Sequence, residues 1–261
     1  MRNCLIMGFG RSGTSLMAGI LHHAGYFSGN DLYPPRKSNP HGFFENAFVN
    51  GINENILKKF DYKNLPMDLP SCSKPHSPYK PGEGHRWLTY IAGDTKIEHC
   101  DDMIENNIRE AIKVSGYAYK DPRFNYTLGI WNNQIKDDAV YICMFRQPDI
   151  TVGSVLLECE YADYLSNFYI DLNLAYKLWF NSYFHLFNNI SSISGERIVF
   201  IHYEQLLDGR ILTELANKLG VPIDSSFVIP ELNRSKPAGT VPDNVLEMYN
   251  GMCKMAGFHY L

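Results

Sequence analysis

The feature that most limits how this chain can fold is an apolar run followed by a glycine-rich loop and a second apolar segment. The first run covers residues 3–7, the loop contains Gly8, Gly10 and Gly13, and residues 16–21 are again mostly apolar. This order is typical of a strand, a phosphate-binding loop and a helix. Glycines adopt backbone conformations that other residues avoid, so successive N–H groups can point at one anion. The loop therefore predicts binding of a phosphate-like oxyanion.

The loop departs from that of nucleoside triphosphatases at one position. Its spacing from Gly8 to Ser15 fits G-x-x-x-x-G-K-[ST], but Thr14 replaces the lysine that holds the β- and γ-phosphates. The positive charge is on Arg11 instead. The run Arg-Ser-Gly-Thr-Ser resembles the 5′-phosphosulfate loop of the sulfotransferases, in which a Lys or Arg contacts the transferred group. The resemblance implies a donor site made of Gly10, Arg11, Ser12, Gly13, Thr14 and Ser15. The alternative is a glycine-rich turn without a ligand.

A second motif follows the apolar run at residues 139–145, which has the composition of a central parallel strand. Arg146 stands directly after this run, where kinases and NTP hydrolases usually place a magnesium-binding aspartate. Its guanidinium is a permanently charged donor fork that suits a phosphate. Arg146 and Ser154 are eight positions apart, which resembles the 3′-phosphate motif of sulfotransferases. The resemblance implies that these two residues hold the 3′-phosphate of the donor.

Ionisable residues also follow a short predicted strand at 117–119. The run Lys120, Asp121, Pro122, Arg123 stands there, and ligands bind at the carboxyl ends of strands in α/β sheets. A Lys-Asp-Pro-Arg run at this place is similar to one in bacterial sulfotransferases. The three ionisable residues are therefore site candidates, Asp121 as a catalytic group and the two cations for the substrate. The alternative is an ordinary cluster of surface ions.

The expected general base is Glu45. It ends the segment Asn39-Pro40-His41-Gly42-Phe43-Phe44-Glu45, which is similar to an Asn-Pro-x-Gly-x-x-Glu segment of bacterial-type sulfotransferases that carries a candidate base. Glu45 could equally cap a helix that begins near Ala47, and the two roles are compatible. Asp121 ranks second, because Lys120 and Arg123 on either side are expected to depress its pKa and make it a weaker base.

Length and composition predict one domain over residues 1–261. The motifs and their resemblance to the sulfotransferases imply an α/β fold with a central, mostly parallel sheet flanked by helices, in a P-loop-like sulfotransferase architecture. Residues 60–100 are expected to be a variable segment that acts as a lid or binds the acceptor. The net charge of −4 argues against nucleic acid as a partner. Six cysteines without a C-x-x-C pair, no signal segment and no run long enough to span a membrane predict a cytoplasmic protein.

Further helices are expected at 47–60, 101–114 and 169–190, and a strand near 197–204 that leads into a helix ending at Gly220. Beyond them, Arg234 and Lys236 lie in a turn-like tail. Many sulfotransferases use a late basic loop on the 3′-phosphate, but the usual Arg-Lys-Gly pattern is absent, so whether either cation touches that phosphate is left open.

The resemblance implies transfer of a sulfuryl group from 3′-phosphoadenosine 5′-phosphosulfate (PAPS) to a hydroxyl or amine, with adenosine 3′,5′-bisphosphate (PAP) as product. No metal is expected, because a sulfuryl group carries less charge than a phosphoryl group. The alternatives are a P-loop kinase and a module that binds a nucleotide without chemistry. The acceptor could be a small molecule such as a phenol, a glycan, a lipid or a peptide, and the oligomeric state is open.

Overall fold

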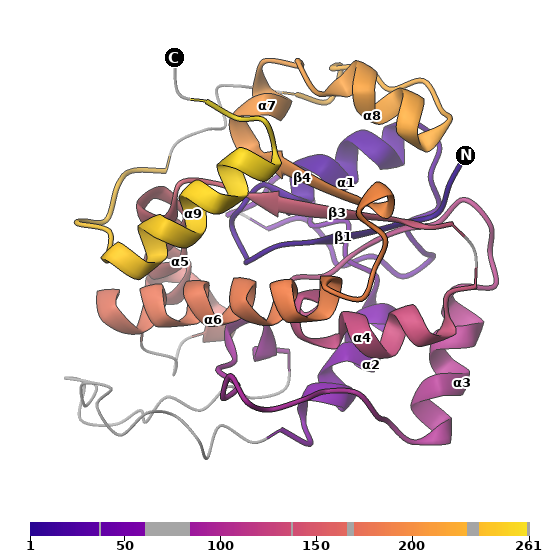
Figure 1. Ribbon diagram of the computed structural model, residues 1–261, viewed down its shortest axis with the longest axis horizontal. Coiled ribbons are helices and arrows are strands. Elements are labelled where there is room, and N and C mark those ends of the chain that lie inside the picture. The colour runs from indigo at the N-terminus through magenta and orange to yellow at the C-terminus, as the bar shows by residue number, and fades with distance from the viewer. Residues whose placement is uncertain (37, 61–83, 137, 166–169, 229–234, 260–261) are drawn as a thin grey trace.

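Four parallel strands form the centre of the molecule in the computed structural model (Figure 1). The model describes residues 1–36, 38–60, 84–136, 138–165, 170–228 and 235–259. The strands are β1 (Cys4–Met7), β2 (Ala118–Lys120), β3 (Val140–Phe145) and β4 (Ile198–His202), in the spatial order β2-β1-β3-β4. The expected α/β fold with a parallel sheet is thus confirmed.

Alternate residues of each strand enter two separate cores. In β3, Val140, Ile142 and Met144 pack on one face of the sheet, and Tyr141, Cys143 and Phe145 pack on the other. This alternation follows from the two-residue repeat of a strand. Both faces are covered by helices, so the strands are mostly apolar, as parallel strands in α/β folds usually are, and the ionisable residues Lys120 and His202 stand at the carboxyl ends of β2 and β4.

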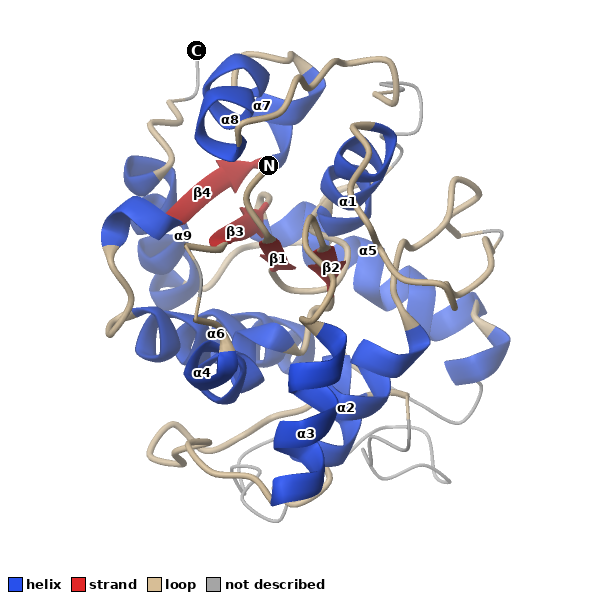
Figure 2. Cartoon of the chain, turned by 90° about the vertical axis from the view of Figure 1, so that its right-hand side faces the viewer, coloured by secondary structure: helices blue, strands red, loops and turns tan. Residues whose placement is uncertain are grey.

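The helices form a layer on each face of the sheet. Helices α1 (Thr14–His23), α7 (Tyr203–Leu207) and α8 (Leu212–Leu219) cover one face, and Figure 2 shows them on the side opposite α4 and α6. The remaining elements are α2 (Ala47–Leu57), η2 (Arg86–Leu88), α3 (Asp102–Ala111), α4 (Phe124–Gln134), α5 (Pro148–Tyr161), η3 (Asp163–Leu165), α6 (Leu172–Ile190), η4 (Gly195–Arg197) and α9 (Asp243–Met255).

Local capping signals explain where several helices begin. Side chains of Asn46, Asp101 and Asp171 accept hydrogen bonds from backbone N–H groups in the first turns of α2, α3 and α6, as polar N-cap residues do. Pro148 occupies the first turn of α5, where a missing N–H costs nothing. These helices agree with the expected ones to within a few residues at each end.

Two parts of the chain differ from the expectation. Helix α9 follows the turn-like tail, in a stretch where no element was expected, and it buries Val245, Tyr249 and Met252. Of the segment at 60–100, residues 61–83 lie outside the described residues, whereas Trp87 and Leu88 are buried in the core. Nothing in the described part tests a lid.

The strand order places two loop ends side by side. From β1 the chain leads to β2 on one side, while β3 and β4 lie on the other, so the order of the sheet reverses between β1 and β3. Ligands bind at the carboxyl ends of strands at such a reversal. The glycine loop follows β1 and Arg146 follows β3, so both stand at the favoured position. No helix among the described residues is long and apolar enough to cross a membrane.

Candidate functional site

The glycine loop connects β1 to α1 and is tightly packed. Gly8 has a φ of 141°, and a Cβ there would overlap the carbonyl oxygen of Met144 on β3. Gly13 has a φ of 89° and forms the N-cap of α1 without any side-chain cap. A Cβ at Gly10 would overlap the ring of Trp87, and one at Gly13 would overlap the ring of Tyr203. Each glycine is therefore required by space, by conformation or by both.

The loop ends at the N-terminus of α1, where the first N–H groups lack partners inside the helix and attract anions. The side chains there are not all directed outward. The Ser12 hydroxyl is buried against the Tyr183 hydroxyl at 3.2 Å, and the Ser12 N–H donates to Phe9 O. Thr14 is buried and Ser15 is half-buried. The Ser12 hydroxyl thus serves the packing of the loop, and the N–H groups of the first turn of α1 stay candidates for contact with an anion.

Arg11 has a left-handed backbone with a φ of 70°, which is unfavourable for a residue with a Cβ. Its side chain is fixed on one side by protein acceptors. Nε donates to Ser154 Oγ at 3.0 Å, Nη2 donates to the Ser38 carbonyl at 3.2 Å, and Nη1 lies 3.8 Å from Glu158 Oε2. The structure therefore brings Arg11 and Ser154 into direct contact.

Arg146 is buried at the end of β3. Its guanidinium lies over the ring of Tyr203, 4.5 Å from the ring centroid, and Nη1 is 3.4 Å from Ser235 Oγ. Burial, and to a lesser extent the positive charge of Arg11, lowers the pKa of Arg146. An anion bound beside Arg146 would act in the opposite direction on this pKa, because its charge would stabilise the charged form of the guanidinium.

The late basic loop also reaches this region. A Cβ at Gly153 would overlap the carbonyl oxygen of Lys236, and Ala238 N–H donates to Asp149 O at 3.2 Å. The backbone of Lys236 therefore lies one residue from Ser154 along α5. Arg234 lies outside the described residues.

The Lys-Asp-Pro-Arg run belongs to a buried ionic cluster. Lys120 Nζ pairs with Glu45, whose other oxygen accepts from Asn50 at 2.7 Å. Asp121 accepts from Asn53 at 2.8 Å and pairs with Arg123 at 2.9 Å. Arg123 and Arg86 both pair with Glu54. Because Lys120, Asp121 and Arg123 are all buried, the alternative of a surface ion cluster is wrong.

Glu45 does not cap α2. Asn46 is the N-cap residue and accepts from Val49 N–H at 3.0 Å. The Glu45 carboxylate turns instead toward Lys120 and keeps 15% of its side chain exposed, whereas Asp121 is 0% exposed.

The expectation that neighbouring cations depress the pKa of Asp121 is also wrong. Burial raises the pKa of Asp121, and its pair with Arg123 does not offset this. Burial acts in the same direction on Glu45, but the charges of Lys120 and Arg123 and two hydrogen bonds outweigh it and lower the pKa of that carboxyl. Of the two cations expected to depress the pKa of Asp121, Lys120 pairs with Glu45 instead. Accessibility, and not charge, is what still favours Glu45 as a base.

Several residues in contact with the site were not predicted. Tyr203 joins Gly13 to Arg146, Trp87 covers Gly10, and Glu158 faces Arg11. The contact of Glu158 could have been predicted from the sequence, since Glu158 stands four residues after Ser154 and so lies on the same helix face. The contact of Trp87 with Gly10 could not, because it depends on how a segment distant in sequence packs against the loop.

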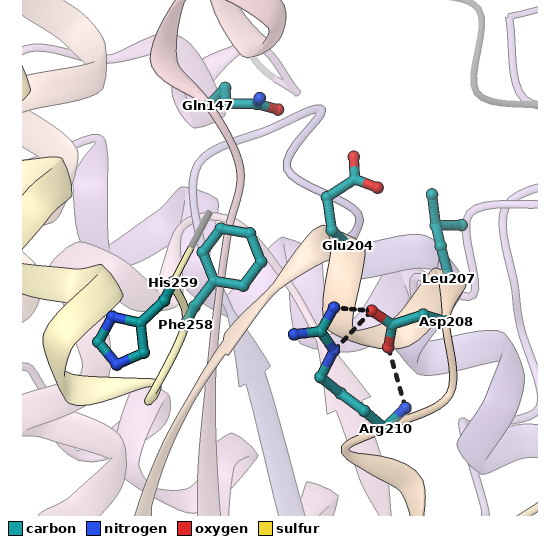
Figure 3. Close-up of a pocket in the computed structure, with 7 residues that line it drawn as sticks. All are labelled: Gln147, Glu204, Leu207, Asp208, Arg210, Phe258 and His259. Atoms are coloured by element: carbon teal, nitrogen blue, oxygen red, sulfur yellow. Dashed lines mark hydrogen bonds and ion pairs between the residues drawn. The ribbon is translucent and has the colours of Figure 1, made fainter. Parts of the chain in front are cut away.

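A pocket of about 430 Å³ is lined in part by Gln147 and Glu204, which follow Arg146 and Tyr203 in the sequence (Figure 3). An ion pair between Arg210 and Asp208 lies along one wall. The pocket is lined by Gln147, Glu204, Leu207, Asp208, Arg210, Phe258 and His259. None of the predicted site residues lines it.

Comparisons with known proteins identify the family and the fold. The model described as "Sulfotransferase family" matches residues 4–224. The sulfotransferase domain from the Synechococcus PCC 7002 olefin synthase shares 14% identity and a TM-score of 0.52, covering 99% of this chain and 95% of that one. The sulfotransferase domain from the curacin biosynthetic pathway shares 14% identity and a TM-score of 0.52, covering 100% of this chain and 99% of that one. Sulfotransferase STF9 from Mycobacterium avium shares 13% identity and a TM-score of 0.55, covering 99% of this chain and 77% of that one. No curated protein matches. At such identities the solved structures establish the fold alone.

Proposed function

Because the chain belongs to the sulfotransferase family, we propose that it transfers a sulfuryl group from PAPS to a hydroxyl or amine of an acceptor and releases PAP. One observation carries the proposal. Arg11 and Arg146 stand at the carboxyl ends of the neighbouring strands β1 and β3, and the Tyr203 ring contacts both Arg146 and the glycine loop. A nucleotide with phosphates on both sides of its ribose requires two separate cationic sites of this kind.

The donor is proposed to lie along these sites. The N–H groups at the start of α1, in residues Gly13, Thr14 and Ser15, would receive the 5′-phosphate. Arg146 and Ser154 would hold the 3′-phosphate, and the exposed Lys236, whose backbone lies beside Gly153, is a further candidate for that phosphate. Tyr203 offers an aromatic surface for the nucleoside between the two phosphates.

Arg11 is proposed to act on the reacting group itself. Transfer develops negative charge on the oxygen that bridges sulfur and phosphorus, and a preorganised cation stabilises such charge. The Arg11 guanidinium meets this need because its contacts with Ser154 and Ser38 fix it before the donor arrives. A sulfuryl group needs less neutralisation than a phosphoryl group, so protein donors suffice in this proposal.

The acceptor must lose a proton as its oxygen or nitrogen attacks sulfur, and Glu45 is proposed as the base. Its carboxylate is ionised at neutral pH because Lys120 and Arg123 lower its pKa. It is the more accessible of the two candidates, since Asp121 is fully buried among Asn53 and Arg123. Lys120 pairs with Glu45 and Arg123 pairs with Asp121. Through these pairs the two cations are proposed to set the net charge of the region that binds the acceptor.

A P-loop kinase is the main alternative. Such an enzyme needs a lysine where Thr14 stands and a magnesium ligand at the end of the central strand. Thr14 is buried and Arg146 occupies that strand end, so neither need is met by these residues. A module that binds nucleotide without chemistry is the other alternative, and only an assay of transfer separates it from an enzyme.

The proposal is tested by incubating the protein with PAPS labelled in the sulfuryl group and with panels of phenols, glycans, lipids and peptides. Label in an acceptor, together with an equal amount of PAP, supports the proposal. Transfer of label from γ-labelled ATP in the presence of magnesium would support the kinase. PAP binding without transfer to any panel member and without hydrolysis of PAPS would support the binding module.

A further inference from the structure

Glu158 is a buried carboxylate that no motif assigns to the site. It lies on α5, and its side chain is 4% exposed. Oε1 accepts from the Ser38 hydroxyl and from the Tyr164 hydroxyl, both at 3.1 Å, while Oε2 faces Arg11 Nη1 at 3.8 Å. A buried carboxylate is costly unless it is paired and hydrogen-bonded. Glu158 contacts Arg11, Ser38 and Tyr164, which belong to three different segments. We therefore expect this buried carboxylate to have a function.

The contacts of Arg11 indicate what that role is. Ser154 and Glu158 are four residues apart on α5, so they present one face to the same guanidinium. A guanidinium has five N–H groups in a fixed plane. Nε donates to Ser154 and Nη2 donates to the Ser38 carbonyl, and the Glu158 carboxylate lies 3.8 Å from Nη1 as an ion-pair partner without a hydrogen bond. The two hydrogen bonds set the plane of the Arg11 head group, and the charge of Glu158 holds it toward α5.

The backbone of Arg11 supports this interpretation. Its φ of 70° is unfavourable for a residue with a Cβ, and glycine would avoid this strain. The conformation persists because the surrounding contacts hold the residue in place, and the acceptors on α5 supply part of them.

Glu158 also connects Arg11 to the loop that ends at the proposed base. Ser38 lies between Arg36 and Asn39, which form an isolated bridge, and the loop closes where Leu32 pairs with Asn46, next to Glu45. Ser38 contacts Arg11 through its carbonyl and Glu158 through its hydroxyl. The carboxylate thus bonds to the acceptor-side loop and faces the donor-side cation.

We infer that Glu158 is a positioning residue, which holds the Arg11 guanidinium against α5 in the orientation that meets the transferred sulfuryl group. The inference rests on the proposed function, because it assigns Glu158 an effect on PAPS that acts through Arg11. Glu158 itself does not touch the donor. Its influence is therefore expected to vanish when Arg11 is removed.

The test is a double-mutant cycle read by calorimetry with PAPS and PAP. Glu158→Gln keeps the size of the side chain and an acceptor oxygen but removes the charge. Glu160→Gln, at an exposed position of the same helix, is the matched control. In the wild-type background Glu158→Gln is expected to weaken PAPS roughly tenfold, within the range of coupling between contacting residues, and to weaken PAP less than about twofold. In an Arg11→Ala background it is expected to change neither affinity.

Three outcomes overturn the inference. The first is that Glu158→Gln weakens the binding of PAPS and PAP equally. The second is that Glu158→Gln weakens PAPS binding as much in the Arg11→Ala background as in the wild-type protein. The third is that Glu158→Gln binds PAPS more tightly than the wild-type protein does. Failure of the wild-type protein to bind PAPS or PAP would instead contradict the proposed function, so the two failures are distinguishable. Should Glu158→Gln not fold, as judged by thermal unfolding, Ser38→Ala replaces it, since this variant removes a donor to Glu158. It is then expected to weaken PAPS about threefold and to have no effect without Arg11.

Discussion

The Nε–H group of Arg11 donates to Ser154 Oγ at 3.0 Å, although 143 positions separate the two residues in the chain. The cation of the loop after β1 therefore touches a hydroxyl of α5, the helix that follows β3. Arg146, at the end of β3, is close enough to Arg11 for the positive charge of Arg11 to contribute to lowering the pKa of Arg146, after burial. Two motifs that lie far apart in the sequence are thus in direct contact in the fold.

Replacing Arg11 by alanine is expected to remove most of the transfer rate, because this side chain is proposed to stabilise the charge of the leaving phosphate. Lysine is expected to restore only part of it, since a point charge cannot keep the fork of contacts with Ser154 and Ser38. The measurement is PAP formation from PAPS in a single turnover. An Arg11→Ala protein that turns over at the wild-type rate would refute the role.

Arg146→Ala is expected to weaken PAP far more than adenosine 5′-phosphate, because only PAP carries the 3′-phosphate. Loss of one charge-assisted contact corresponds to about 1.5–3 kcal/mol. Calorimetric titration of both nucleotides checks this. Equal losses for the two would mean that Arg146 stabilises the pocket in general and does not read the 3′-phosphate.

Glu45→Gln is expected to reduce the rate of transfer about a hundredfold or more, while PAP affinity stays nearly unchanged because the donor contacts lie elsewhere. Asp121→Asn is the comparison. Asp121 is fully buried and paired with Arg123, so its loss is expected to lower the free energy of unfolding by about 3 kcal/mol and to affect the rate only through folding. Full activity in Glu45→Gln beside a folded but inactive Asp121→Asn would exchange the two roles.

The ion pair of Glu45 with Lys120 predicts a dependence of stability on pH. Burial opposes ionisation of Glu45, but Lys120, Arg123 and two hydrogen bonds outweigh it, so its pKa in the folded state lies below the usual 4.5. A depressed carboxyl pKa stabilises the fold above the unfolded pKa, and the contribution is lost as the pH falls below that value. The difference in free energy of unfolding between wild type and Glu45→Gln is thus expected to be largest near about pH 7 and to shrink below about pH 4.5. Urea unfolding over this range checks it, and a difference that is independent of pH would count against the pair.

The parts of the fold that follow from local chemistry could be predicted. The glycines at 8, 10 and 13, the apolar run that ends at Arg146 and the proline at the start of α5 each act within a few residues. The parallel sheet then brings the strand ends together without further information. Helix α9 was also within reach, because Val245, Tyr249 and Met252 repeat at helical spacing after Pro242.

The contacts inside the site could not be predicted, because they depend on burial and on pairs distant in sequence. Nothing in the order Lys120, Asp121, Arg123 shows that Lys120 turns to Glu45 while Asp121 turns to Asn53. The neighbours of Asp121 in sequence therefore gave the wrong direction for its pKa. Desolvation is set by packing, and packing cannot be read from adjacent charges.

The central claim is that this chain binds a 3′-phosphorylated adenosine nucleotide as its sulfuryl donor. Its most direct test is calorimetric titration of the wild-type protein with PAP, with adenosine 5′-phosphate and with ATP plus magnesium. The account predicts that PAP binds most tightly, that removal of its 3′-phosphate weakens binding, and that magnesium makes no difference. Tighter binding of ATP with magnesium, or equal affinity for PAP and adenosine 5′-phosphate, would contradict it.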